Sequence, residues 1–295
     1  MENIPYDKRT GKIWFNGKSV NWSDAKIHVL NHGLHYASCV FEGERVYEGE
    51  IFKLAEHTER LFYSAKRMGI EIPYSEEEIN TACKKIVSIQ KVQNGYVRPV
   101  IWRGSEMMAI SAQKNKINVA IATWEWGSYF DPKLKLNGIK LNISSWRRPA
   151  PNSIPWDTKA AGLYMICTLS KHEAEKDGFT DSLMLDHEGN IAEATGANIF
   201  FKNKNGELHT PIPDSFLDGI TRRAIIEIAK TKGVVVKEKK ILPDDMKNYV
   251  GCFLTGTAAE VTPVSQIDKY NFKVCDLITE LNISYQALVR KKSAA

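Results

Sequence analysis

The sequence lacks the features that mark several large classes of protein. No apolar run approaches the length needed to cross a bilayer, and the charged N-terminus has no apolar core of a secretory signal. The five cysteines are odd in number, widely spaced and without a C-x-x-C pair, which argues against a disulfide framework. We therefore expect a cytoplasmic protein with reduced thiols.

Signatures of nucleotide binding and hydrolysis are also missing. The chain contains no Walker A loop, G-x-G-x-x-G, H-E-x-x-H or G-x-S-x-G motif. Its net charge is +5, but basic and acidic residues are interleaved, without the basic face and aromatic platforms of a nucleic-acid binder. We expect small-molecule substrates and neither nucleic acid nor membrane as a partner.

The chain has 295 residues, and 43% of them are hydrophobic, which is enough for a sizeable core. Asn16-Gly17 lies between alternating apolar residues and predicts a hairpin, because both residues accept positive φ. Periodicity and stop or capping signals predict helices over 54–68 and from 76 onward. Two strand-like runs, 95–104 and 117–126, complete the first half.

Residues 127–138 hold two glycines and a proline and are the best candidate for a linker. Beyond them strands and helices alternate clearly. Helices are predicted over 162–176 and 218–233, and strands over 139–146, 181–186, 191–201, 234–238, 250–256 and 260–264. We predict an α/β fold (α+β mixed) with two domains, 1–126 and 139–295, whose hairpins exclude a purely parallel sheet.

Four local patterns invite a functional reading. Lys159 stands in "IPWDTKAAGLY" among small residues that leave space around it, and Glu193 lies in mid-strand, where burial requires a cation. Asp218-Gly219 and Thr221 open a helix whose N-terminus suits a phosphate. The turn at Thr257 and Ala258 exposes backbone N–H groups. Each pattern also has an ordinary reading: an exposed lysine, an exposed strand residue, a plain cap and a plain turn.

The histidines of "HVLNHGLH" have spacings of four and three, but Gly33 interrupts the segment and no acidic or cysteine ligand is near. We expect packed or polar histidines and no metal site. Three of the patterns above, namely Lys159, Glu193 and the helix start at Thr221, together form the set of groups that holds pyridoxal 5′-phosphate (PLP). A lysine amine joins the aldehyde, a carboxylate meets the ring nitrogen, and a helix start receives the phosphate.

The chain resembles the fold-type IV PLP enzymes, which are D-amino-acid-aminotransferase-like, and most closely the branched-chain amino acid aminotransferases. The resemblance runs from "WFNGKSV" to "TPV", nearly the whole length. It is carried by "LHYASCVFEG", "HTERLFYSAK", "GYVRP", "SSWRRPAPNSIPWDTKAAGLY", "EATGANIF", "LDGITRRAII" and "GTAAEVTPV". It implies a PLP site at the interface of the two domains and a homodimer or higher homo-oligomer.

The resemblance also implies roles at matching positions. Lys159 would carry the cofactor covalently and move the proton, and Glu193 would face the ring nitrogen. The remaining cofactor-binding residues would be Arg60, Tyr164, Leu217, Ile220, Thr221 and Thr257. The substrate would be bound by Tyr36, Phe41, Tyr96, Arg98, Trp126, Tyr129 and Ala258, with Tyr36 reaching the partner subunit's site.

The activity implied is transfer of the amino group of leucine, isoleucine or valine to 2-oxoglutarate, giving branched-chain 2-oxo acids and L-glutamate. Two departures bear on side-chain preference. Residues 103–115 do not match the glycine-rich loop of the family, so that Met107 and Met108 could line the substrate pocket, and Glu44 stands where the family has an apolar residue at the approach to the cleft. The alternatives are a D-amino-acid or (R)-amine aminotransferase, an aminodeoxychorismate lyase, or a non-catalytic protein on the same scaffold.

Overall fold

The computed structural model describes residues 4–127, 129–130 and 136–290. The chain forms two compact units, Met1–Gly127 with Thr158–Gly162, and Ser128–Asp157 with Leu163–Ala295. The predicted linker, 127–138, lies in part outside the described residues. Within the described ranges, no helix combines the length and the apolar character that a membrane crossing requires.

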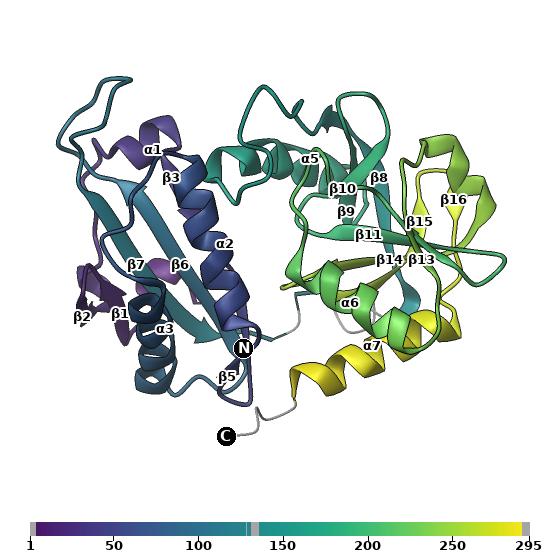
Figure 1. Ribbon diagram of the computed structural model, residues 1–295, viewed down its shortest axis with the longest axis horizontal. Helices are drawn as coiled ribbons and strands as arrows, with labels where there is room; N and C mark the ends of the chain where they lie inside the picture. Colours follow the sequence, from purple (N-terminus) through teal and green to yellow (C-terminus); the bar gives the residue numbers. More distant parts are fainter. Residues whose placement is uncertain (1–3, 128, 131–135, 291–295) are drawn as a thin grey trace. The chain divides into compact units, whose positions relative to one another are not determined.

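The first unit is an antiparallel sheet covered by two long helices, α2 and α3 (Figure 1). Its strands follow the order β2-β1-β7-β6-β4-β5, and β3 also pairs with β6. The strands are β1 (Lys12–Phe15), β2 (Lys18–Asn21), β3 (Cys39–Phe41), β4 (Glu44–Tyr47), β5 (Glu50–Ile51), β6 (Gly95–Arg103) and β7 (Ile117–Glu125). The helices are η1 (Tyr6–Lys8), η2 (Trp22–Asp24), α1 (His32–Tyr36), α2 (Leu54–Arg67) and α3 (Glu76–Gln90).

Local sequence signals account for these elements. Asn16 and Gly17 have φ of 47° and 85°, so the predicted hairpin turn is confirmed between β1 and β2. The side chain of Ser75 accepts from the N–H of Glu78, and the Glu78 carboxylate accepts from the N–H of Ser75. This capping box begins α3 where the sequence predicted it.

The second unit is a mixed sheet in the order β10-β9-β8-β15-β14-β11-β12-β13, with β16 paired to β15. Its strands are β8 (Ile139–Arg147), β9 (Asp181–Leu185), β10 (Ile191–Ala194), β11 (Asn198–Asn203), β12 (Leu208–Thr210), β13 (Val236–Glu238), β14 (Tyr249–Gly256), β15 (Glu260–Ile267) and β16 (Tyr270–Asn271). The helices are α5 (Met165–Lys176), α6 (Ile220–Thr231), η4 (Pro243–Asn248) and α7 (Asp276–Val289), and the turn η3 (Ala161–Tyr164) precedes α5.

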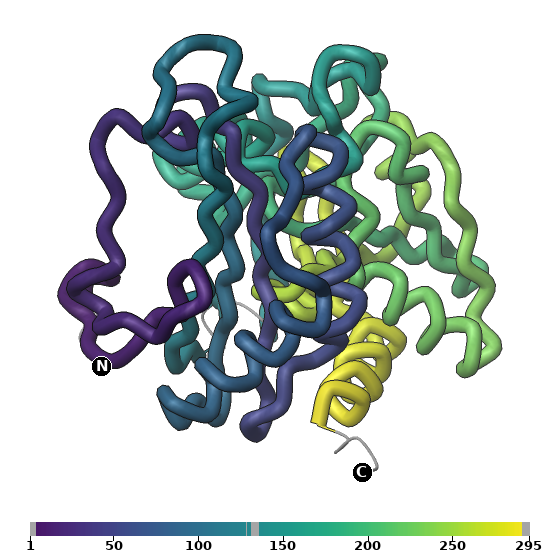
Figure 2. The backbone as a smooth tube through the Cα atoms, turned by 60° about the vertical axis from the view of Figure 1, so that its left-hand side comes forward, coloured from purple at the N-terminus to yellow at the C-terminus, as the bar shows by residue number. Residues whose placement is uncertain are grey.

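Parallel and antiparallel pairs occur together in this second sheet. Strand β8 runs parallel to β9 and β15, whereas β14 is antiparallel to β11 and β15. Helix α5 packs on β8 and β9, and α6 and α7 pack on β14 and β15 (Figures 1 and 2). Completely buried residues such as Leu141, Ile199 and Val264 form the core. The predicted α/β class with hairpin-containing sheets is confirmed.

Two element predictions are wrong in detail. The strand predicted over 191–201 is divided, because the N–H of Ala194 donates to the carbonyl of Ala197 at 2.8 Å and closes a turn between β10 and β11. The pairing of β10 with β9 also shifts between Ile191 and Glu193, so the side chains around Glu193 do not alternate regularly between the two faces of the sheet. The helix predicted from residue 162 begins only at Met165, after the 3₁₀ turn η3.

Candidate active site

Lys159 is fixed through its backbone to the first unit. Its N–H donates to Oγ of Ser64 on α2 at 3.0 Å, and its carbonyl accepts from the N–H of Phe41 in β3 at 3.2 Å. The next residue, Ala160, is 2% exposed and forms an antiparallel bridge with Val40. Small size at position 160 therefore permits close pairing with β3, a reason that the sequence did not reveal.

The surroundings of the Lys159 amine favour its neutral form. Its Nζ lies 4.8 Å from the centroid of the Phe41 ring. Burial lowers the pKa of the amine; the positive charges of Arg60 and Arg98 lower it further, against the opposing effects of Glu42 and Tyr96. A lysine with a lowered pKa can act as a nucleophile and as a base near neutral pH.

Arg60 is held by a buried carboxylate that the sequence analysis did not single out. Its Nε and Nη2 donate to Glu42 Oε1 and Oε2 at 2.7 and 2.9 Å, and Glu42 is completely buried. His57 Nδ1 lies 2.7 Å from Oε2, and we assign the proton to Nδ1 because a carboxylate only accepts. Burial opposes ionisation of Glu42, but Arg60 and His57 outweigh it and hold its pKa well below the usual range.

Aromatic rings and the guanidinium of Arg98 form a second cluster in the same unit. The Arg98 guanidinium lies 4.6 Å from the ring centroid of Phe41, and its Nη2 donates to the hydroxyl of Tyr96 at 3.4 Å. The Tyr96 ring meets that of Trp126 edge-on at 4.7 Å. The structure thus brings together six predicted site residues of this unit: Phe41, Arg60, Tyr96, Arg98, Trp126 and Lys159.

Gly43 is required for this cluster, because a Cβ built on it would lie 1.7 Å from the Tyr96 hydroxyl.

Two other predicted substrate residues are exposed. Tyr36 on α1 is 43% exposed and packs on His32, and Tyr129 is 44% exposed and packs edge-on against Phe130.

In the second unit, Glu193 meets the cation that its burial requires. The Nε of Arg148 lies 3.5 Å from Glu193 Oε1, and both residues are less than a tenth exposed. The Nη1 of Arg148 also donates to the carbonyl of Leu163 at 3.4 Å, which connects Glu193 to the residue before Tyr164. Asn198 Nδ2 donates to Glu193 Oε2 at 3.2 Å.

The N-terminus of α6 lies beside Asn198. Gly219 is the N-cap residue of α6, no side chain of the described residues caps the helix, and Ile220 and Thr221 are each 3% exposed. Asp218, which could have capped the helix, instead accepts from Arg222 Nη1 at 2.8 Å. The first N–H groups of the helix therefore remain suited to an anion.

The turn with Thr257 and Ala258 joins β14 to β15 at the same end of the sheet. Thr255, near the end of β14, pairs in register with Asn198. A Cβ on Gly256 would lie 3.3 Å from Ala197 Cβ, so this turn passes close to the one between β10 and β11. The predicted residues Glu193, Leu217, Ile220, Thr221, Thr257 and Ala258 thus come from segments that converge on Asn198.

Comparison with known proteins shows to which family this chain belongs. Residues 39–267 match the family described as amino-transferase class IV. The chain belongs to the class IV aminotransferases.

A probable branched-chain-amino-acid aminotransferase of Rickettsia bellii (strain RML369-C) is 46% identical to this aminotransferase over 89% of both chains. The branched-chain-amino-acid aminotransferase of Pseudomonas aeruginosa is 42% identical over 88% of this chain and 86% of its own. Among solved structures, the T.th. branched-chain amino acid aminotransferase with pyridoxamine 5′-phosphate has a TM-score of 0.93 and 37% identity, covering 97% of this chain and 96% of its own. A second structure of that enzyme, complexed with N-(5′-phosphopyridoxyl)-L-glutamate, has a TM-score of 0.90 at 36% identity and the same coverage.

Four residues of this aminotransferase escaped the sequence analysis: Glu42, His57, Arg148 and Asn198. A signal existed for Asn198, because a polar residue at the start of the apolar run "NIFF" must find partners when it is buried. A buried Glu193 requires a cation, and Arg148 is that cation. The two residues are 45 positions apart, so the sequence alone does not show that they pair. Only the fold identifies these contacts.

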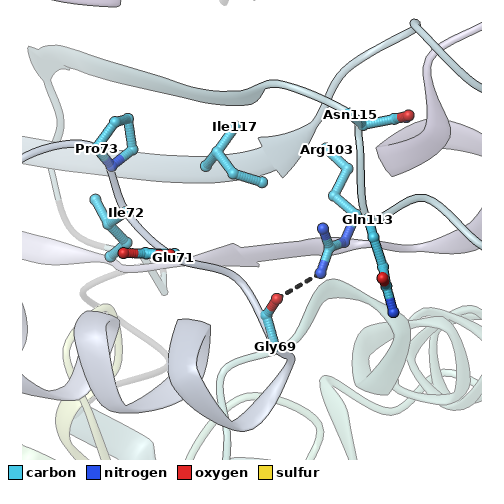
Figure 3. Close-up of a pocket in the computed structure, with 8 residues that line it drawn as sticks. All are labelled: Gly69, Glu71, Ile72, Pro73, Arg103, Gln113, Asn115 and Ile117. Atoms are coloured by element: carbon cyan, nitrogen blue, oxygen red, sulfur yellow. Dashed lines mark hydrogen bonds between the residues drawn. The ribbon is translucent and has the colours of Figure 1, made fainter.

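Residues 103–115, which do not match the glycine-rich loop of the family, contribute to the lining of a pocket in the first unit. Figure 3 shows this pocket of about 520 Å³, lined by Gly69, Glu71, Ile72, Pro73, Arg103, Gln113, Asn115 and Ile117. Arg103 Nη2 donates to the carbonyl of Gly69 at 2.6 Å across it. None of the eight residues is a predicted site residue. Met107 is exposed and Met108 is half-buried, so their assignment to a substrate pocket stays a prediction.

The structure also shows the surroundings of the histidines and of Glu44. The histidines of α1 and its approach contact backbone groups: His32 Nε2 lies 3.0 Å from the carbonyl of Ala109, and His35 Nε2 lies 2.9 Å from that of Val29. Glu44 was expected at the approach to the cleft, and its position relative to a cleft stays a prediction. The side chain is completely buried in β4, because the strand pairs with β6 and faces α3.

Proposed function

We propose that this protein is a PLP-dependent aminotransferase that moves the amino group of leucine, isoleucine or valine to 2-oxoglutarate. The relatives named above support the donor class, and the glutamate adduct in the second T.th. structure supports the acceptor. The observation that carries the proposal is the state of Lys159. Its backbone N–H and carbonyl are both hydrogen-bonded, and its amine has a lowered pKa.

The residues present fit PLP. An uncapped helix start suits its phosphate, a buried carboxylate held by Arg148 suits its ring nitrogen, and a neutral amine suits its aldehyde. When bound, PLP supplies an electron-poor ring that makes the α-hydrogen of the amino acid acidic. The chain itself must supply a base, an orientation for the substrate and exclusion of water.

Each predicted cofactor residue receives a role on this basis. Lys159 holds the cofactor and, once released, takes the proton from the α-carbon of the substrate. Glu193 faces the ring nitrogen, Tyr164 the phenolic oxygen, and Leu217 one face of the ring. Arg60, oriented by Glu42, binds the phosphate together with Ile220, Thr221 and Thr257.

The substrate residues explain how one pocket accepts two kinds of side chain. Phe41, Tyr96, Trp126 and Tyr129 offer apolar ring surface to an aliphatic chain. Arg98 lies among these rings and offers a cation to the second carboxylate of glutamate. The backbone of Ala258 binds the α-carboxylate, and Tyr36 contributes to the partner subunit's site.

An amino-donor panel tests the proposal. Purified protein with PLP and 2-oxoglutarate should form glutamate from L-leucine, L-isoleucine and L-valine, with ping-pong kinetics, because donor and acceptor use one site in turn. D-Alanine and a simple (R)-amine are the matched controls and should react at least about tenfold more slowly, since their shapes miss the apolar pocket. Turnover of the controls but of none of the three L-amino acids would contradict the branched-chain assignment and favour a D-amino-acid or (R)-amine enzyme.

We further propose that the protein is a cytoplasmic homodimer. Its five cysteines all lie in the described residues and none of them is in a disulfide, as in a reducing compartment. The stretch before β3 exposes Ile27, Val29, Leu30 and Leu34, between 49% and 68% each. It runs along the outside of the first unit as the dark purple trace in Figure 2 and contacts the 104–109 loop through His32. An apolar surface of this extent suits an interface.

Substitution within that surface should dissociate the dimer. Wild-type protein should have twice the monomer mass of 33.4 kDa, whereas the double variant Val29→Asp/Leu34→Asp should have the monomer mass. Light scattering coupled to size exclusion measures both. Ile283→Asp on α7 is a matched control, because Ile283 and Leu34 are both 63% exposed. A monomeric wild type, or a double variant with the wild-type mass, would contradict this interface.

A further inference from the structure

The amide of Asn198 connects three segments of the second unit. Its Nδ2 donates to Glu193 Oε2 at 3.2 Å and to the carbonyl of Leu217 at 3.0 Å. Its Oδ1 accepts from the N–H of Gly219 at 3.1 Å. Asn198 is 4% exposed, so these hydrogen bonds form away from solvent.

The orientation of this amide is determined by its partners. The N–H of Gly219 can only donate and the carbonyl of Leu217 can only accept, so exchanging the oxygen and nitrogen of the amide would break both contacts. Gly219 is part of the same fit, because a Cβ at that position would lie 2.2 Å from Asn198 Oδ1. The backbone of Asn198 is fixed in turn by its pairing with Thr255 of β14.

One side chain therefore sets the position of Glu193 relative to the start of α6. Glu193 is restrained on its other side by Arg148 at 3.5 Å, and Asp218 by Arg222 at 2.8 Å. Removing the Asn198 amide breaks the connection that it makes between the Glu193 carboxylate and the turn at 217–219. The turn leads directly into Ile220 and Thr221 of α6.

We infer that Asn198 is a positioning residue that fixes the separation between the carboxylate of Glu193 and the N–H groups at the start of α6. The inference rests on the proposed function, in which these two groups meet the ring nitrogen and the phosphate of one cofactor. PLP is a rigid ring with a short phosphate arm, so both ends bind well only when the two groups have a fixed spacing. Pyridoxal lacks the phosphate and does not depend on that spacing.

The ratio of the affinities for PLP and pyridoxal tests this role in the full-length apo protein. Asn198→Ala should weaken PLP binding at least about tenfold but pyridoxal binding only about twofold to threefold, so the ratio of the two affinities falls. Asn198→Asp keeps the size and the acceptor for Gly219, but it places a carboxylate against Glu193 and the carbonyl of Leu217. It should weaken PLP binding further at pH 8 and recover toward the Asn198→Ala value at pH 5, because burial and the neighbouring Glu193 carboxylate raise the pKa of the new acid so that it gains a proton as pH falls.

The matched control is Asn203→Ala at the other end of β11, where, among the described residues, the side chain bonds only to the turn at 205–207. It should leave the affinity ratio unchanged. Circular dichroism checks that each variant folds, and the near-isosteric Asn198→Asp provides the test if Asn198→Ala does not. An unchanged ratio in a folded Asn198 variant overturns the inference, whereas failure of the wild type to bind PLP overturns the proposed function instead.

Discussion

Replacing Lys159 with alanine should lower turnover at least about 10³-fold and leave the fold intact. A positioned proton-transferring side chain contributes 10²–10⁴-fold by itself, and in our proposal the same amine also anchors the cofactor. The backbone contacts of residue 159, to Ser64 and Phe41, do not involve the side chain and survive the substitution. We therefore expect the unfolding free energy to change by no more than about 1 kcal/mol.

Steady-state rates with L-leucine, together with denaturant unfolding, check this prediction. Lys159→Arg is the informative second variant, because a guanidinium keeps the charge but is not deprotonated in proteins, so it should be as inactive as the alanine variant. Lys66→Ala, an exposed position on α2, is the matched control and should retain wild-type turnover. After borohydride reduction with PLP, peptide mapping should find the label at Lys159. A label elsewhere, or an active alanine variant, would remove the basis of the proposed function.

Elements whose signals are local could be predicted from the sequence. The Asn16-Gly17 turn, the capping box at Ser75 and the end of α2 near Gly69 depend only on residues a few positions apart. The break between β10 and β11 could not be predicted, because it depends on tertiary contacts. Thr195 Oγ1 donates to Asp181 at 2.6 Å in another strand, and this holds the turn in place of a continuous strand.

In the candidate site, too, some residues could be identified from the sequence and others could not. The motif resemblance identified residues that carry chemistry, such as Lys159 and Glu193, and the structure gathers those of each unit around local clusters. The residues that orient them were not found, because Arg148 and Glu42 act through partners far away in the sequence. Glu44 was identified as unusual, but its complete burial was not predicted, since a sequence alone does not show which face of a strand is buried.

Glu44 makes the stability of the first unit depend on pH in an unusual direction. The residue is 0% exposed, and neither carboxyl oxygen has a hydrogen-bond partner among the described residues. Burial raises its pKa well above the usual range, and the negative charge of Glu42 raises it further, against a smaller opposing effect of Arg60. The Cys83 thiol faces it from α3, where burial and Glu44 both raise the pKa of that thiol. The native protein therefore keeps a proton on Glu44 that the unfolded chain releases at about pH 4.3.

The sign of the effect follows from this difference in bound protons. Because the native state binds the extra proton, the unfolding free energy falls as pH rises above the pKa of the unfolded chain, and the fall stops above the native pKa. One proton gives at most about 1.4 kcal/mol per pH unit, or about 4 kcal/mol between pH 5 and pH 8. Glu44→Gln cannot ionise and keeps the size of the side chain, so it should match the wild type at pH 5 and be more stable than it at pH 8.

Urea unfolding followed by tryptophan fluorescence measures the difference, since five of the seven tryptophans lie in the first unit. Glu50→Gln on the neighbouring strand β5 is the matched control and should follow the wild type at every pH, because its side chain is exposed. Glu42→Gln should show the opposite sign. Arg60 and His57 hold the pKa of Glu42 below its usual range, so its contribution to stability is present above the pKa of the unfolded chain and is lost only as pH falls. If Glu44→Gln and the wild type keep the same difference from pH 5 to pH 8, Glu44 is ionised in the native state and the burial argument is wrong.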